Sequence, residues 1–252
     1  MTPQFDVPND HRQPFFVDGG PDSKKVLFIH GFTGSPQTFL PQYIAAANAG
    51  HTVSVPLLSG HGTVLEDMLG TRYEDYLRDV DQAAQGLGEE NEAIYVVGIS
   101  MGGTLSLDLA LRNRRVKAMV LVNPLVLPPP PDFFDLIDQV LESGLEIFPA
   151  IGSDIANPEM EEASYPGAPV RAAKSLFEAA KELSPKVSEI AIPILLFNST
   201  QDHVVAVESG EYLRDNAQNV TRVVLEKSFH VATLDYDSEI ITEGMLEFIT
   251  KN

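Results

Sequence analysis

Three residues far apart in the sequence could together carry out nucleophilic catalysis. Ser100 stands at the centre of the pentapeptide Gly98-Ile99-Ser100-Met101-Gly102, which has the form Gly-x-Ser-x-Gly. A serine hydroxyl is a poor nucleophile until a base removes its proton, and an acid must hold that base in the right tautomer. Asp202 and then His230 follow in the order expected after such a serine. These residue types predict acyl transfer through an acyl-enzyme.

The sequence around Ser100 predicts the elements that would present its hydroxyl. Residues 94–97 form a wholly apolar run typical of a buried strand. Residues 103–112 carry apolar side chains on one side, which predicts a helix. A sharp turn between them would lift the hydroxyl above the edge of the sheet. Glycines at positions 98 and 102 fit this turn, because side chains there would collide with the adjoining strand and helix.

Asp202 and His230 each follow a predicted strand. Asp202 lies just past the apolar run 193–197, and His230 lies just past residues 223–225. Catalytic groups in open α/β sheets lie outside the carboxyl ends of the strands, so we expect both residues beside Ser100. An isolated aspartate after a strand is usually a turn residue and an isolated histidine is usually structural, but order and placement together favour a triad. The remaining histidines fit less well: His11, His30, His51, His61 and His203.

An acyl-transfer site also needs an oxyanion hole, in which backbone N–H groups stabilise the negative charge that develops on the carbonyl oxygen. Met101 follows the nucleophile at the start of a helix, where the helix dipole assists. The second donor is expected in the loop after an earlier strand, residues 30–34, and Phe32 is the candidate. Gly31 in the same loop is a candidate for contact with the substrate. The alternative is that the glycines of this loop only form a tight turn.

Strands and helices alternate along most of the chain. This alternation is typical of a mostly parallel sheet with helices on both faces, so the predicted fold class is α/β. Thr71 with Glu74 three residues later predicts a capping box for one helix. The predicted strands are 15–17, 26–29, 52–55, 94–97, 119–122, 193–197 and 223–225. The predicted helices are 34–49, the helix after Thr71, 103–112, 171–183, 207–216 and a final amphipathic helix.

The alternation stops between about residues 125 and 169. Four prolines at 128–131 predict a stiff extended spacer, and residues 132–141 form a plausible amphipathic helix. The rest of this segment shows no clear periodicity. We interpret it as an insertion over the sheet edge, within a single domain of residues 1–252. A long ordered loop and a flexible linker are alternatives, and the many apolar residues disfavour the linker.

The composition limits the possible partners. The formal net charge is −19, which would repel nucleic acid and anionic membrane surfaces and favours small neutral substrates. There is no cysteine, so disulfides, thiolate nucleophiles and cysteine-bound metals are absent. No run approaches the length of a membrane helix and the first residues lack the pattern of a signal peptide, which favours a cytoplasmic protein. No metal or cofactor is expected, and the sequence leaves the oligomeric state open.

With these motifs in place, the chain resembles the α/β-hydrolase fold and is similar to bacterial monoacylglycerol lipases and related small carboxylesterases. The resemblance covers about residues 26–249. Gly152-Ser153-Asp154-Ile155 and Tyr165-Pro166 point to the narrower family. The superfamily motifs are His30 to Pro36, Gly60 to Thr63, Gly98 to Gly103, Asp202 to Val205 and His230 to Asp235.

The resemblance implies a serine hydrolase that cleaves carboxylic esters, monoacylglycerols foremost, beneath a small cap formed by the insertion. It also implies that Ile151 lines an apolar acyl tunnel near the glycerol end and that Glu162 binds the glycerol hydroxyls. Glu159 and Glu161 leave the register of that acid open, and a solvated surface acid is the alternative. The four-proline spacer departs from the family pattern, so chain-length preference stays open. A broad-specificity or feruloyl-type carboxylesterase, and a small-ligand receptor on the same fold, are the other functional readings.

Overall fold

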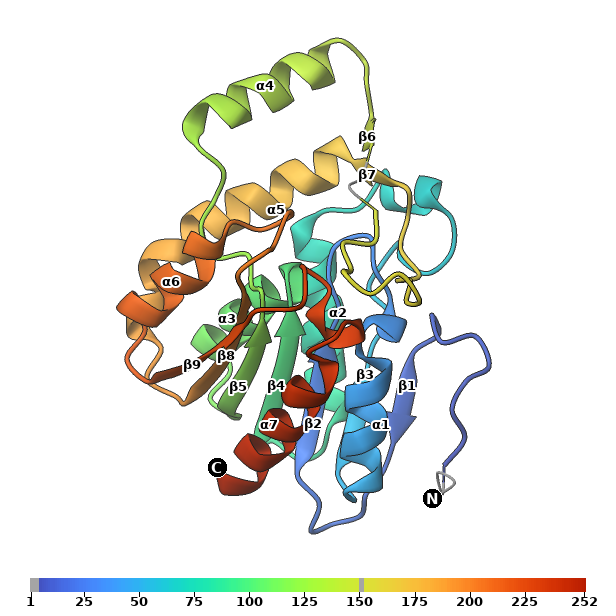
Figure 1. Cartoon of the computed structure of the whole chain (residues 1–252), viewed down its shortest axis with the longest axis vertical. Helices are drawn as coiled ribbons and strands as arrows, with labels where there is room; N and C mark the ends of the chain where they lie inside the picture. The colour runs from blue at the N-terminus through green and yellow to red at the C-terminus, as the bar shows by residue number, and fades with distance from the viewer. Residues whose placement is uncertain (1–4, 150–151) are drawn as a thin grey trace.

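The computed structural model describes residues 5–149 and 152–252, which are arranged around a seven-stranded sheet (Figure 1). The strand order is β1-β3-β2-β4-β5-β8-β9, in which β1 runs antiparallel and the other strands run parallel. The carboxyl ends of the parallel strands therefore meet at one edge, as predicted. The bounds are β1 Phe15–Val17, β2 Lys25–Ile29, β3 Thr52–Val55, β4 Ile94–Ile99, β5 Val116–Val122, β8 Ile194–Ser199 and β9 Val220–Leu225.

Helices cover both faces of this sheet, which confirms the predicted α/β fold. Side chains alternate between the two faces of a strand, so Val96 of β4 enters one apolar cluster and Val97 enters the other. α2, α3 and α5 pack on the first face, and α1 and α7 pack on the second. The helices are α1 Leu40–Asn48, α2 Tyr73–Gly86, α3 Met101–Arg112, α4 Pro131–Glu142, α5 Val170–Leu183, α6 Val207–Asn216 and α7 Ser238–Lys251.

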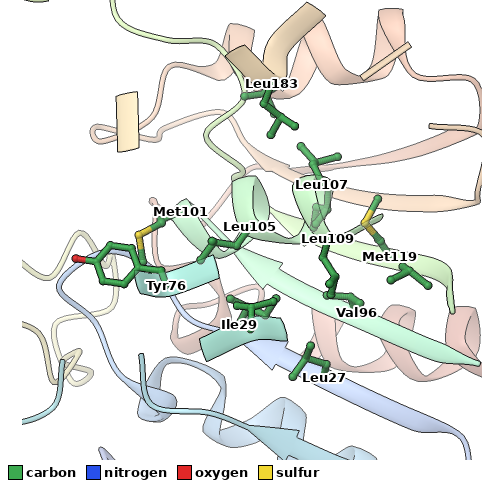
Figure 2. Packing of buried hydrophobic residues seen from close by; sticks show 14 of the residues in the cluster. Leu27, Ile29, Tyr76, Val96, Met101, Leu105, Leu107, Leu109, Met119 and Leu183 are labelled. Carbon is green, nitrogen blue, oxygen red and sulfur yellow. The ribbon is translucent and has the colours of Figure 1, made fainter. Parts of the chain in front are cut away.

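The packing of α3 against the central strands fixes the position of the helix that follows Ser100. Leu105 and Leu109 are fully buried, and Figure 2 shows them directed from α3 toward the strands that carry Ile29 and Val96. Burial of each such side chain contributes about 1.5–3 kcal/mol relative to exposure. Over the described ranges, no helix combines the length and the apolar character needed to cross a bilayer.

The predicted capping box of α2 is wrong by one residue. The helix begins at Tyr73, and the Asp75 carboxylate accepts the backbone N–H of Arg72 at 2.7 Å. The Thr71 hydroxyl instead donates to a backbone carbonyl at 2.8 Å and is hydrogen-bonded to the buried Tyr76 hydroxyl at 2.6 Å. Thr71 is thus used to satisfy a buried phenol, a tertiary contact that local sequence does not reveal.

The insertion between β5 and α5 contains regular structure, so a flexible linker is the wrong description of its described residues. α4 lies on α5 (Figure 1), with Ile137 fully buried, the Phe133 and Phe177 rings edge to face, and Lys174 paired with Asp138 at 2.7 Å. Beyond it, β6 Ile147–Pro149 and β7 Gly167–Pro169 form a short antiparallel pair. The last proline of the spacer is the first residue of α4, a position that suits proline because its missing N–H has no partner there.

The turn from β4 into α3 depends on its two glycines. Ser100 has φ 55° and ψ −120°, a backbone conformation that residues other than glycine rarely adopt. A Cβ on Gly98 would lie 2.4 Å from the Gly102 carbonyl oxygen, and a Cβ on Gly102 would lie 1.9 Å from the Ile29 carbonyl oxygen. Both distances are far below van der Waals contact, which confirms the reason predicted for these glycines.

We therefore expect Gly102→Ala to destabilise the fold by about 3 kcal/mol or more, because α3 would have to move away from β2. Gly86→Ala is the matched control, since Gly86 also lies in a helix and an added Cβ there meets open space. It should change the free energy of unfolding by at most about 1 kcal/mol, toward stabilisation. Urea unfolding followed by circular dichroism measures both, and equal midpoints would contradict the packing argument.

Candidate active site

The structure brings Asp202 and His230 together at the carboxyl edge of the sheet. Asp202 lies in the loop after β8, and His230 lies in the loop after β9. The His230 Nδ1–H donates to Asp202 Oδ2 at 2.8 Å, and both side chains are buried. Asp202 Oδ1 accepts the backbone N–H groups of Val204 and Val205, each at 2.8 Å. The carboxylate is thereby fixed from both sides, and Nε2 of the imidazole is left to act on a proton.

Ser100 and the loop that carries His230 (residues 226–231, called the histidine loop) are both hydrogen-bonded to the carboxyl end of β5. The Ser100 N–H donates to the carbonyl oxygen of Val122, the last residue of β5, at 3.2 Å. Asn123 follows, and its Nδ2 donates to the His230 carbonyl oxygen at 2.8 Å. In the described part of the chain, the Ser100 hydroxyl has no hydrogen bond to His230. Such bonds are often long without substrate and tighten when it binds.

Asn123 is a site residue that sequence reasoning missed. It is 1% exposed and has φ 44°, which is unusual for a residue other than glycine. Besides its bond to the histidine loop, its amide exchanges hydrogen bonds with Ser199 at the end of β8, at 3.0 and 2.8 Å. It therefore joins two strand ends and the histidine loop. The available signal was a polar residue directly after a buried strand, the same signal that led to Asp202.

The loop of residues 30–34, which contains the proposed oxyanion donor Phe32 and is called the oxyanion loop below, lies against Ser100. A Cβ on Gly31 would lie 3.4 Å from the Ser100 Cβ, so this loop passes directly beside the serine. Within residues 5–149 and 152–252, the backbone N–H groups of Phe32 and Met101 have no acceptor. Donors without an acceptor, one of them at the start of α3, are what stabilisation of an oxyanion requires.

Two buried histidines support this loop, a role that the sequence did not reveal. Nε2 of His61 accepts the N–H of Thr33 at 3.2 Å, and its Nδ1–H donates to the Ser59 carbonyl oxygen at 3.0 Å. Thr33 has φ 64°, so this strained residue is held by the ring. The His30 Nδ1–H donates to the Gly31 carbonyl oxygen at 2.9 Å. Burial lowers the pKa of His30 to about 4 and that of His61 to about 3, which keeps both rings neutral.

Glu162, rather than its exposed neighbours Glu159 and Glu161, faces the oxyanion loop. The Thr38 hydroxyl donates to Glu162 Oε1 at 2.7 Å, and a Cβ on Gly34 would lie 2.9 Å from the same oxygen. Burial raises the pKa of Glu162 above its ordinary value, and the Thr38 hydroxyl and nearby His230 oppose that shift. Its contact with a substrate stays a prediction. Ile151, the other insertion residue predicted to line the site, lies outside the described residues.

The buried state of His61 predicts a pH-dependent stability. In the unfolded chain a histidine takes up a proton near pH 6.5, whereas His61 in the folded chain resists protonation until about pH 3. Below pH 6.5 the unfolded state thus binds more protons than the folded state. As the pH is lowered, this group therefore reduces the free energy of unfolding by up to about 1.4 kcal/mol for each pH unit. In His61→Gln, urea unfolding between pH 7 and pH 5 should show a shallower fall than in the wild type. Parallel curves would contradict a neutral His61.

Comparison with known proteins supports the fold and relates the site to a family. The sequence profile of the family described as serine aminopeptidase, S33, matches residues 20–237. The thermostable monoacylglycerol lipase of Bacillus sp. strain H-257 is 36% identical over 257 residues, covering 100% of this chain and 99% of that protein. A carboxylesterase of Bacillus subtilis strain 168 is 27% identical over 245 residues, covering 95% of this chain and 96% of that protein.

Solved structures agree. A structure from the study of LipS and LipT, two metagenome-derived lipolytic enzymes, superposes with a TM-score of 0.88 at 32% identity and covers 96% of this chain and 98% of its own. A soluble variant of monoglyceride lipase from Saccharomyces cerevisiae shares the fold, with a TM-score of 0.78 at 14% identity and coverage of 100% and 97%. The strained serine turn, the buried histidine–aspartate pair and these matches together assign the chain to the serine aminopeptidase S33 family of α/β-hydrolases.

Proposed function

We propose that this chain is a serine hydrolase that cleaves carboxylic esters and prefers monoacylglycerols. The observation that carries the proposal is the buried His230–Asp202 hydrogen bond of 2.8 Å, held beside the strained turn that presents Ser100. Among the residues that the structure describes, the N–H groups of Phe32 and Met101 lack an acceptor, and this supports the proposal because such groups next to the serine can bind negative charge.

In this mechanism, Ser100 Oγ attacks the ester carbonyl carbon while His230 Nε2 takes the hydroxyl proton. The carbonyl oxygen becomes an oxyanion and accepts the N–H groups of Phe32 and Met101. The imidazolium then gives its proton to the leaving alcohol, and the C–O bond to the alcohol breaks. Water attacks the acyl-enzyme with His230 again as the base, which releases the acid and restores Ser100. Asp202 holds the tautomer and stabilises the charged ring throughout.

The choice of monoacylglycerols rests on the insertion and on the relatives. Glu162 brings a partly buried carboxylate over the oxyanion loop, where it could accept hydrogen bonds from the two hydroxyls of a glycerol head group. The net charge of −19 favours a neutral substrate over an anionic one. The Bacillus relative that is 36% identical is itself a monoacylglycerol lipase. The cytoplasmic location and the absence of a nucleic-acid partner stay predictions.

Kinetics on matched substrates test the reaction. We expect Ser100→Ala to lower kcat at least about 10⁴-fold on monoacylglycerols and on p-nitrophenyl esters of the same acyl groups, and Asp202→Asn to lower it by a similar order. Turnover that does not depend on the glycerol head group would instead favour a broad carboxylesterase. If the wild type bound a monoacylglycerol tightly but hydrolysed it almost not at all, a small-ligand receptor would be favoured.

Glu162→Gln tests the head-group site. The variant keeps the size of the side chain but weakens acceptance from two hydroxyls, so kcat/KM for monoacylglycerols should fall by about tenfold or more relative to p-nitrophenyl acetate. Glu161→Gln, the exposed neighbour, is the control and should leave that ratio unchanged. If both variants keep the wild-type ratio, Glu162 does not recognise glycerol.

A further inference from the structure

A buried carboxylate of the insertion touches the loops that carry both His230 and Asp202. Asp154 lies on the segment that returns from the insertion, and its side chain is 8% exposed. Its Oδ2 accepts the backbone N–H of His230 at 3.1 Å and that of His203 at 3.2 Å. Its Oδ1 accepts the Nδ1–H of the His203 ring at 2.8 Å. One carboxylate therefore binds the backbone of the proposed base and that of the residue directly after the proposed acid.

These contacts constrain the geometry on which proton transfer depends. The bond between His230 and Asp202 joins two separate loops, so its length depends on how the loops sit relative to each other. The carboxylate of Asp154 lies between them and binds both. The His203 ring also packs edge-on against Phe229 with centroids 4.6 Å apart, so its contact with Asp154 is reinforced from the histidine loop.

A second carboxylate makes the reciprocal connection. Asp235 lies outside the insertion, a few residues after His230, and is 5% exposed. It accepts the N–H groups of Ala156 and Asn157 in the insertion at 2.7 and 3.0 Å. It also accepts the N–H of Phe229 in the histidine loop at 2.9 Å. If the returning segment of the insertion moved away from the histidine loop, several backbone N–H groups would lose their carboxylate acceptors, which is unfavourable for buried groups.

We propose that Asp154 is a positioning residue, supplied by the insertion, that sets the relative placement of His230 and Asp202. The inference rests on the proposed function, since it gives Asp154 a role in the same triad. Loss of the carboxylate would leave the N–H groups of His203 and His230 without an acceptor, and the two loops would relax apart. A displacement of about 1 Å in a catalytic group can lower the rate by about 10²-fold.

Two variants of Asp154 separate positioning from packing. Asp154→Ala removes every acceptor, so kcat on p-nitrophenyl acetate should fall by about 10–100-fold while KM stays within about twofold. This ester has no glycerol head group, so a change in its kcat does not report on head-group recognition and reports on the triad. Asp154→Asn should recover kcat to within about fivefold of wild type, because its amide oxygen can accept both backbone N–H groups and its NH₂ can donate to the other tautomer of His203.

Asp237→Ala is the matched control. Asp237 is 3% exposed and accepts two backbone N–H groups of the same histidine loop, those of Lys227 and Ser228 at 3.1 and 3.0 Å. Its carboxylate has no hydrogen bond to His203, His230 or the insertion among the residues that the structure covers. Its removal should destabilise the fold, as judged by thermal unfolding, but lower kcat of the folded enzyme by less than about threefold.

The outcomes are distinct. The same kcat in Asp154→Ala and Asp237→Ala would overturn the positioning role. A change confined to KM for monoacylglycerols would also overturn it, because Asp154 would then only hold the insertion. If Ser100→Ala stayed fully active, the proposed function itself would fall and this inference with it. Full kcat in Asp154→Ala together with an inactive Ser100→Ala would remove the inference alone.

Discussion

The close approach of α3 to β2 is the contact on which the rest of the site depends. At Gly102 the helix backbone lies so near the Ile29 carbonyl that even one added carbon would be 1.9 Å from it. This contact sets the height of Ser100 above the sheet and, because β2 leads into the oxyanion loop, it also places Gly31 against the serine. The proposed nucleophile and the proposed oxyanion donors therefore depend on the same backbone contact between two buried elements.

Neutral polar groups, not charges, hold the oxyanion loop in place. His30 and His61 are buried as uncharged rings, each with one nitrogen donating and the other accepting. By contrast, the loops behind His230 are held by carboxylates that accept backbone N–H groups. The two halves of the site thus use different kinds of polar support, neutral imidazoles around residues 30–34 and carboxylates around His230.

The fold, and the placement of the candidate site residues at the ends of strands, could be predicted from the sequence because the signals are local. The apolar run before Ser100 and the alternation of strands and helices follow from burial on both faces of a parallel sheet. The positions of Asp202 and His230 follow from a strand ending just before each. The four-proline spacer was harder to interpret, since Pro131 begins α4 instead of ending the extended segment. Likewise, the start of α2 was misplaced because Thr71 bonds to Tyr76, a contact made only in the folded protein.

The supporting residues were missed because their partners are distant in the sequence. Asn123 bonds to a residue 107 positions later, and His61 bonds to Thr33 from 28 positions away. Nothing in the residues next to them indicates these partners. Asp154 and Asp235 belong to the same group, although both fall in motifs that pointed to the family.

The reciprocal carboxylates of Asp154 and Asp235 have a consequence for the modularity of the fold. An insertion that contacted the rest of the domain only at its two ends could be exchanged between related proteins without other changes. Here α4, in the first half of the insertion, packs on α5. The second half is hydrogen-bonded through Asp154 to His230 and through Ala156 to Asp235. A chimera with a foreign insertion would therefore keep these contacts only if it retained Asp154, so the downstream boundary for such an exchange lies before Gly152.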